Sequence, residues 1–158
     1  GVGLLCRGHH ADGLVHIGVE LVASGRVDGQ DLVAFQCCQQ LAQRGIKWGI
    51  VTNKPMRFTD RLVPALPWSV PPEVIVSGDT VGVAKPDPKP LLYAAEQLAV
   101  APELCIYLGD AERDVEAAIA AGMKPVIANY GYIAASDEPH KWGAAAFIDN
   151  PQQLIDYL

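Results

Sequence analysis

Short apolar runs alternate with longer amphipathic stretches from about residue 30 to the end of the chain. The runs are rich in Val and Ile and are bounded by Gly, Pro and polar residues, a pattern typical of buried strands. Strands are predicted at residues 47–51, 74–76, 105–108 and 125–128, with a candidate edge strand at 147–148. Helices are predicted over residues 31–44, 57–65, 87–98 and 112–121, and after Asn150-Pro151. This alternation predicts right-handed βαβ units, and therefore an α/β fold with a parallel sheet flanked by helices.

Residues 1–30 lack this alternation. They contain seven glycines and three histidines between short apolar runs that show no clear period. We therefore treat residues 1–30 as an atypical, unassigned N-terminal segment and assign residues 31–158 to one α/β core. A chain of 158 residues is long enough to bury a core of this kind.

Composition narrows the classes of function. Half of the residues are hydrophobic and 19% are charged, which indicates a globular protein. The net charge of -6 and the lack of a basic run argue against a nucleic-acid partner. No apolar stretch reaches the roughly 18 residues of a membrane helix, and the N-terminus lacks a signal-peptide pattern, so we expect no membrane partner. The four cysteines show no metal-ligand spacing, and adjacent cysteines such as Cys37-Cys38 rarely bridge to each other, so we expect a reducing, cytoplasmic location.

Polar side chains follow several of the predicted strands. Thr52 and Asn53 come directly after one strand, Ser77-Gly78-Asp79 after the next, and Asp110 after a third. In parallel α/β sheets ligands bind at the carboxyl ends of the strands, so these residues should share one edge. A hydroxyl at a strand tip followed by backbone N–H groups can hold phosphate oxygens. Taken alone, Thr52 fits a local turn at least as well.

Lys85 lies in the sequence Lys85-Pro86-Asp87-Pro88, just before a predicted helix start. A lysine in that place can reach an anion bound near the N-terminus of the helix. The competing interpretation is a solvated loop lysine. The flanking prolines favour the first interpretation, because they stiffen the loop and fix the direction of the side chain.

Two acids follow the strand at 105–108. Asp110 stands at the strand end and Asp114 lies four residues later, in the first turn of the next predicted helix. Carboxylates on one side at this spacing suit Mg²⁺, which takes one or two carboxylates together with waters and a substrate phosphate. The alternative makes Asp110 a helix N-cap and Asp114 an acid that favours the helix dipole.

Together, Thr52, Lys85 and the acid pair Asp110 and Asp114 occur in the motif order of the haloacid dehalogenase-like phosphatases. Within that superfamily the chain resembles the bacterial phosphoglycolate phosphatases, especially the branch that includes N-acetylmuramate-6-phosphate phosphatase. The residues that carry the resemblance are 48–58, Lys85-Pro86-Asp87-Pro88, 130–133 and 142–144, within a matching stretch of about residues 39–158.

The resemblance implies a Rossmann-like core, normally with a helical cap, and Mg²⁺-dependent hydrolysis of a small phosphorylated metabolite such as 2-phosphoglycolate or a sugar phosphate. It implies catalytic roles for Thr52, Lys85 and Asp110. It further implies phosphate contacts from Thr52, Asn53 and Lys85, and a Mg²⁺ site at Asp110 and Asp114, where Asp114 acts through water or Lys85.

The family mechanism also uses an Asp nucleophile in an Asp-x-Asp-Gly-Thr motif on the first strand, with the second Asp as acid and base. Residues 1–51 contain no Asp-x-Asp. The nearest match, His10-Ala11-Asp12-Gly13-Leu14, would place His10 at the nucleophile position and Asp12 at the acid position, although a Gly-rich stretch can produce such a match by chance. We expect instead that the start is truncated or rearranged, with the first strand and the helical cap missing or replaced.

Two functions therefore stay open. The first is a phosphatase core whose present sequence hydrolyses phosphomonoesters negligibly, because a covalent route without its nucleophile loses several orders of magnitude in rate. The second is a non-catalytic module that binds a phosphate or a partner on the same core. A phospho-acceptor regulatory domain would need paired acids after an early strand, and the sequence has none there.

Overall fold

The computed structural model describes the backbone of residues 2–7 and 29–156, and the side chains of residues 32–156. The helices are α1 (Gly29–Gln43), α2 (Met56–Leu62), α3 (Lys89–Gln97), α4 (Glu112–Ala120) and α5 (Gln152–Asp156). The strands are β1 (Val2–Arg7), β2 (Ile46–Thr52), β3 (Val74–Val76), β4 (Ile106–Gly109), β5 (Lys124–Ala128) and β6 (Ala146–Ile148). They form one sheet in the order β3-β2-β1-β4-β5-β6. The predicted α/β fold is confirmed.

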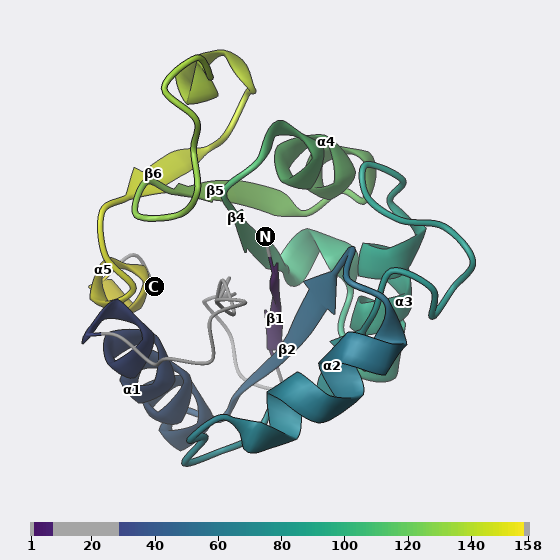
Figure 1. Cartoon of the computed structure of the whole chain (residues 1–158), viewed down its shortest axis with the longest axis vertical. Helices are drawn as coiled ribbons and strands as arrows, with labels where there is room; N and C mark the ends of the chain where they lie inside the picture. Colours follow the sequence, from purple (N-terminus) through teal and green to yellow (C-terminus); the bar gives the residue numbers. More distant parts are fainter. Residues whose placement is uncertain (1, 8–28, 157–158) are drawn as a thin grey trace.

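Helices cover both faces of the sheet (Figure 1). On one face, α1 and α5 pack over Ile106 and Leu108 of β4, and on the other, α3 and α4 pack over Tyr107. Successive side chains of a strand point to opposite faces, so a fully buried strand such as β4 needs an unbroken apolar run. The α1 face also buries the thiols of Cys37 and Cys38.

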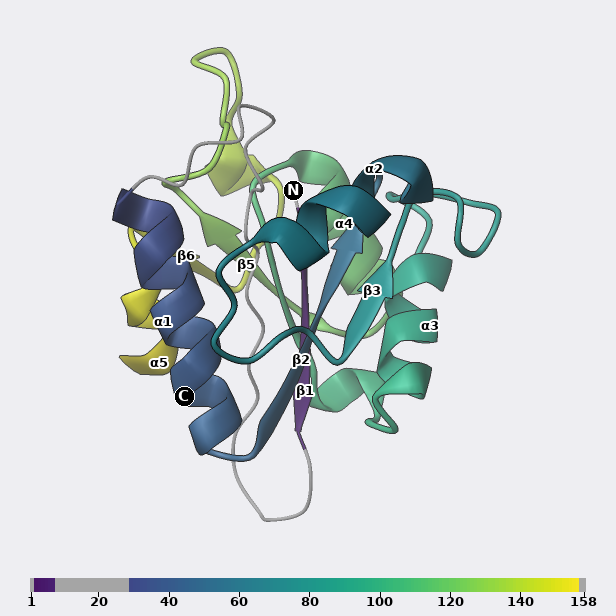
Figure 2. The same cartoon turned by 60° about the horizontal axis from the view of Figure 1, so that its bottom comes forward.

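Helix α2 lies across the carboxyl ends of β2 and β3 (Figure 2). The sequence predicted one helix over 57–65, and the structure has α2 followed by a 3-10 turn at Val63–Ala65, which contains Pro64. The helix predicted from residue 87 begins at Lys89, where the Asp87 carboxylate accepts a hydrogen bond of 2.8 Å from the Lys89 N–H. None of the helices in the described part of the chain has the length and apolar content needed to cross a membrane.

Strand β1 is the main difference from the sequence-based expectation. It belongs to the segment that we left unassigned, and it occupies the middle of the sheet between β2 and β4. It runs antiparallel to both neighbours, with Val2 opposite Thr52 and Arg7 opposite Ile46. The other strand pairs, β2–β3, β4–β5 and β5–β6, are parallel as predicted.

The direction of β1 decides which of its ends meets the carboxyl edge of the other strands. Its first residues lie at that edge, beside Thr52, and its last residue lies at the opposite edge, beside Ile46. A family-type first strand would instead end at the Thr52 edge. The interpretation of His10 and Asp12 as a degenerate catalytic motif concerns residues that lie outside the described ones.

Candidate active site at the carboxyl edge of the sheet

Thr52 is buried at the end of β2 and begins a tight turn. Its Oγ1 accepts a hydrogen bond of 3.1 Å from the Lys54 N–H. The next loop packs directly on this turn, because the Gly78 N–H donates to the Lys54 carbonyl at 2.8 Å. A Cβ on Gly78 would lie 2.2 Å from the carbonyl oxygen of Asn53, so only glycine allows this approach. The backbone at the end of β2 is therefore held in place by the loop that packs on it.

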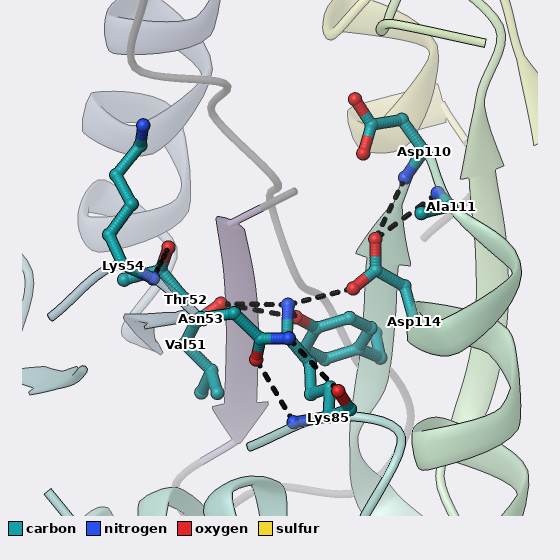
Figure 3. Close-up of polar contacts among 9 residues, drawn as sticks. Val51, Thr52, Asn53, Lys54, Lys85, Asp110, Ala111 and Asp114 are labelled. Atoms are coloured by element: carbon teal, nitrogen blue, oxygen red, sulfur yellow. Dashed lines mark hydrogen bonds and ion pairs between the residues drawn. The ribbon is translucent and has the colours of Figure 1, made fainter. Parts of the chain in front are cut away.

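Asn53 uses its side chain to hold the Lys85 backbone. The Asn53 Nδ2 donates to the Lys85 carbonyl at 2.9 Å, and the Lys85 N–H donates to Asn53 Oδ1 at 2.9 Å (Figure 3). This reciprocal pair joins the tip of β2 to a loop 32 residues later in the chain. The Asn53 side chain is thus occupied within the protein, and its contribution to a ligand would come from its backbone.

The Lys85 ammonium is buried, so the interpretation of this residue as a solvated loop lysine is wrong. Its Nζ donates to Asp114 Oδ1 at 2.7 Å, to the Tyr107 hydroxyl at 2.7 Å and to the Val51 carbonyl at 3.2 Å. Burial lowers the pKa of Lys85 below its ordinary value, and the Asp114 carboxylate opposes that shift. The cation lies beneath the strand tip, since Val51 directly precedes Thr52.

Both carboxylate oxygens of Asp114 accept hydrogen bonds from other groups of the protein. Oδ1 accepts from Lys85, and Oδ2 accepts from the backbone N–H groups of Asp110 and Ala111, each at 3.2 Å. A Cβ on Gly109 would lie 2.4 Å from Asp114 Cβ, so a glycine at the end of β4 makes room for this carboxylate. Asp114 therefore satisfies orphan N–H groups at the start of α4 while it neutralises Lys85.

Asp110 is placed differently, although it is only four residues away. Its side chain points away from the Lys85–Asp114 pair, and the Lys54 side chain extends in the same general direction (Figure 3). Asp110 Oδ2 accepts a hydrogen bond of 3.0 Å from the Tyr132 N–H. The Lys54 ammonium forms no ion pair with a described residue. The side chains of Asp110, which is itself buried, and of Lys54 thus both point away from the Lys85–Asp114 pair.

The residues described by the structure fit Mg²⁺ only in part. Asp110 offers a strand-end carboxylate of the kind that Mg²⁺ uses, whereas both oxygens of Asp114 are already engaged. Within residues 32–156, no three His, Cys, Asp or Glu side chains come together as a metal-binding group. Among the described residues, Asp110 is thus the candidate direct ligand, and Asp114 could act only as a supporting acid.

Sequence reasoning placed Thr52, Asn53, Lys85, Asp110 and Asp114 at one edge, and the structure brings them there. It missed Tyr107, whose buried hydroxyl accepts from Lys85 and donates to the Val51 carbonyl at 3.2 Å. The signal that could have identified it was the tyrosine hydroxyl within the otherwise apolar sequence of β4, because a buried hydroxyl needs a hydrogen-bond partner. Burial raises the pKa of Tyr107 well above its ordinary value, which keeps this hydroxyl neutral.

Comparison with known proteins points in the same direction. The family model of haloacid dehalogenase-like hydrolases matches residues 7–122. The chain is 46% identical over 116 residues to a phosphoglycolate phosphatase of Xanthomonas campestris pv. campestris, covering 73% of this chain and 52% of that protein. It is 42% identical over 118 residues to the N-acetylmuramic acid 6-phosphate phosphatase of Pseudomonas aeruginosa, covering 75% and 52%. The chain spans about half the length of the curated relatives it matches.

Solved structures show the same core. A hydrolase from Pseudomonas syringae superposes with a TM-score of 0.68 at 26% sequence identity, covering 78% of this chain and 56% of that one. The matched family model extends over most of the chain and includes Thr52, Lys85, Asp110 and Asp114. The chain belongs to the haloacid dehalogenase-like hydrolase family.

Proposed function

We propose that this chain forms the core of a Mg²⁺-dependent phosphomonoester hydrolase of the phosphoglycolate phosphatase type, acting on a small phosphorylated metabolite such as 2-phosphoglycolate or a sugar phosphate. The observation that carries the proposal is the meeting of Thr52, Lys85 and the two acids, from three separate segments, at one edge of the sheet. The relatives named above, one a phosphoglycolate phosphatase and one an N-acetylmuramic acid 6-phosphate phosphatase, support the substrate class.

In this proposal the tip of β2 binds the phosphate. The Thr52 hydroxyl and the Asn53 N–H contact phosphate oxygens. Lys85 contributes a positive charge from beneath, because its ammonium already donates to Asp114, Tyr107 and the Val51 carbonyl. Lys54, which points outward, supplies a cation that can meet the phosphate directly.

Asp110 is the proposed Mg²⁺ ligand. Bound there, Mg²⁺ would neutralise charge on the phosphate oxygens and help to orient the substrate. Asp114 acts indirectly: it holds Lys85 and the backbone N–H of Asp110 in place. With only one direct ligand among the described residues, metal affinity is weak.

We further infer that these 158 residues turn over phosphomonoesters negligibly. Residues 1–51 contain no Asp-x-Asp, and the strand beside Thr52 runs antiparallel to β2. Positioning and electrostatics remain, but they replace little of a two-step covalent route. The reversed strand also favours the second candidate function, a non-catalytic module that keeps the phosphate site.

The test measures phosphate binding and phosphate release on the same samples. Inorganic phosphate should bind the parent chain in the presence of Mg²⁺ and bind Asp110→Asn more weakly. Asp60→Asn serves as the control, because Asp60 is an exposed acid on α2. Phosphate release from 2-phosphoglycolate should stay near background for all three proteins, and a chain that also carries an Asp-x-Asp strand and a cap should be active.

Equal phosphate and Mg²⁺ binding by the parent and Asp110→Asn contradicts the metal assignment. Turnover by the parent at an ordinary enzyme rate, abolished by Asp110→Asn, contradicts the inferred inactivity.

A further inference from the structure

The loop that follows β3 supplies a carboxylate to the first residue of α2. Asp79 Oδ1 accepts a hydrogen bond of 2.8 Å from the Met56 N–H, which lies 23 residues earlier in the chain. The residue before the helix is Pro55, which makes no side-chain cap hydrogen bond. An N–H in the first turn of a helix has no partner within the helix, so an acceptor must come from elsewhere. Asp79 therefore caps α2 from the end of the neighbouring strand.

Two further contacts join the same loop to the segment between β2 and α2. The Gly78 N–H donates to the Lys54 carbonyl at 2.8 Å. The hydroxyls of Ser77 and Thr59 share a buried hydrogen bond of 2.6 Å, and Thr59 also donates to the Met56 carbonyl at 3.1 Å. Because that carbonyl takes the Thr59 proton, the Ser77 hydroxyl is the donor in the shared bond. The loop after β3 thus holds both the turn after β2 and the helix that follows it.

The turn after β2 carries the groups that the proposed function assigns to the phosphate. Thr52 Oγ1 accepts from the Lys54 N–H at 3.1 Å, so the Thr52 hydroxyl keeps its own proton for donation to an anion. The proposed contribution of Asn53 is its backbone N–H, whose direction depends on the same turn. A displacement of the turn by about 1 Å would therefore misplace both donors.

We propose that Asp79 is a positioning residue for the phosphate, because its hydrogen bond to the Met56 N–H holds the turn between β2 and α2. The held turn lets the Thr52 hydroxyl and the Asn53 N–H reach the same phosphate. This inference rests on the proposed function and adds a residue that does not itself touch the ligand.

The charge of Asp79 and its hydrogen bond have opposite effects on an anion. Asp79 is exposed just after β3, and a carboxylate near the phosphate edge repels a phosphate. Asp79→Asn removes the charge and keeps an oxygen that can accept from the Met56 N–H, whereas Asp79→Ala removes both. The two variants should therefore differ in phosphate affinity if the hydrogen bond positions the site.

Binding of inorganic phosphate to the full chain, followed by NMR with Mg²⁺ present, tests the proposal. Asp79→Ala should weaken phosphate binding by about 3- to 10-fold, which corresponds to the loss of one hydrogen bond. Asp79→Asn should bind phosphate at least as tightly as the parent. Mg²⁺ titrations without phosphate should give the same affinity for the parent and both variants, because a positioning residue is not a metal ligand.

Gln153→Ala is the matched control. Gln153 Oε1 accepts a hydrogen bond of 2.6 Å from the Asp149 N–H just before α5, so the substitution also removes a side-chain acceptor from a helix start, at the other edge of the sheet. Urea unfolding reports the stability of each variant. Gln153→Ala should lose stability as Asp79→Ala does and should keep the phosphate affinity of the parent.

Several results would overturn the inference. If Asp79→Ala and Asp79→Asn have the same phosphate affinity, whether higher, lower or equal to that of the parent, the hydrogen bond does not position the site. If both lose Mg²⁺ affinity, Asp79 is a metal ligand. If Gln153→Ala weakens phosphate binding as much as Asp79→Ala does, the loss follows stability alone. In these cases phosphate still binds the parent, so the proposed function survives. If the parent does not bind phosphate, both proposals fail.

Discussion

Asp114 and Asp110 are four residues apart on the same strand-helix connection, yet their surroundings differ in kind. Asp114 is fully buried and gives both oxygens to Lys85 and to backbone N–H groups. Asp110 points away from that cluster and contacts a loop that carries an exposed aromatic residue. The first acid holds the edge of the sheet together, and the second, which is also buried, is the proposed Mg²⁺ ligand. Substitutions of the two acids should therefore differ clearly in their effects on stability and on Mg²⁺ binding.

The largest effect is expected for Asp114→Asn. The substitution leaves the Lys85 charge buried without its carboxylate, which should lower the free energy of unfolding by about 3–5 kcal/mol. Urea unfolding followed by circular dichroism measures the loss. The double variant Lys85→Met/Asp114→Leu removes both charges and should recover much of the stability. A loss below about 1 kcal/mol for the single variant would show that the buried pair does not stabilise the fold.

Tyr107→Phe should have the next largest effect. It deletes the hydroxyl that accepts from Lys85 and donates to the Val51 carbonyl, leaving a buried carbonyl with one partner fewer. A loss of about 1–2 kcal/mol in the free energy of unfolding is expected. The same urea titration measures it, with Tyr93→Phe on α3 as the matched control. Equal stability of Tyr107→Phe and the parent would mean that the hydroxyl is replaceable by water.

The pH dependence of stability offers a third test. Because burial lowers the pKa of Lys85 in the folded chain, the folded state releases this proton before the unfolded state does as the pH rises. The unfolded state then binds more protons, so the Lys85 contribution to the free energy of unfolding should increase as the pH rises toward the ordinary lysine pKa of about 10. The parent should gain stability relative to Lys85→Met over this range. Measurements should stop near pH 10, because the raised pKa of Tyr107 destabilises the folded state above it. If the parent instead lost stability relative to Lys85→Met as the pH rose, the pKa of Lys85 would have to be raised, not lowered, in the folded state.

The smallest effect on stability is expected for Asp110→Asn. The amide keeps an oxygen that can accept from the Tyr132 N–H, so the free energy of unfolding should change by less than about 1 kcal/mol. Mg²⁺ affinity, measured by calorimetry, should fall in the same variant. A destabilisation as large as that of Asp114→Asn would erase the distinction between the two acids.

The positions of strands β2 to β6, and of the candidate site residues at their carboxyl ends, were accessible from the sequence because they depend on local patterns. Apolar runs with polar residues at their ends place Thr52 and Asp110 at strand tips, and parallel topology then gathers those tips at one edge. The sequence could not show that Lys85 points inward to Tyr107, because side-chain direction follows from packing between segments far apart in the chain. For the same reason it could not separate the roles of Asp110 and Asp114.

Local sequence patterns could not predict the direction of β1. A short strand of six residues can pair in either direction, and its orientation is decided by partners at residues 46–52 and 106. Here those partners impose an antiparallel arrangement, with Val2 at the Thr52 edge.

The central place of β1 also bears on aggregation. Strands β2 and β4 pair with each other only through β1, so detachment of this one strand would split the sheet into β3-β2 and β4-β5-β6. Each half would then expose a row of unpaired backbone N–H and C=O groups, and such edges act as templates for pairing with other chains. We expect intermolecular association to begin with release of residues 2–7, and a proline introduced at Leu5 to promote it, since Leu5 pairs with both neighbours.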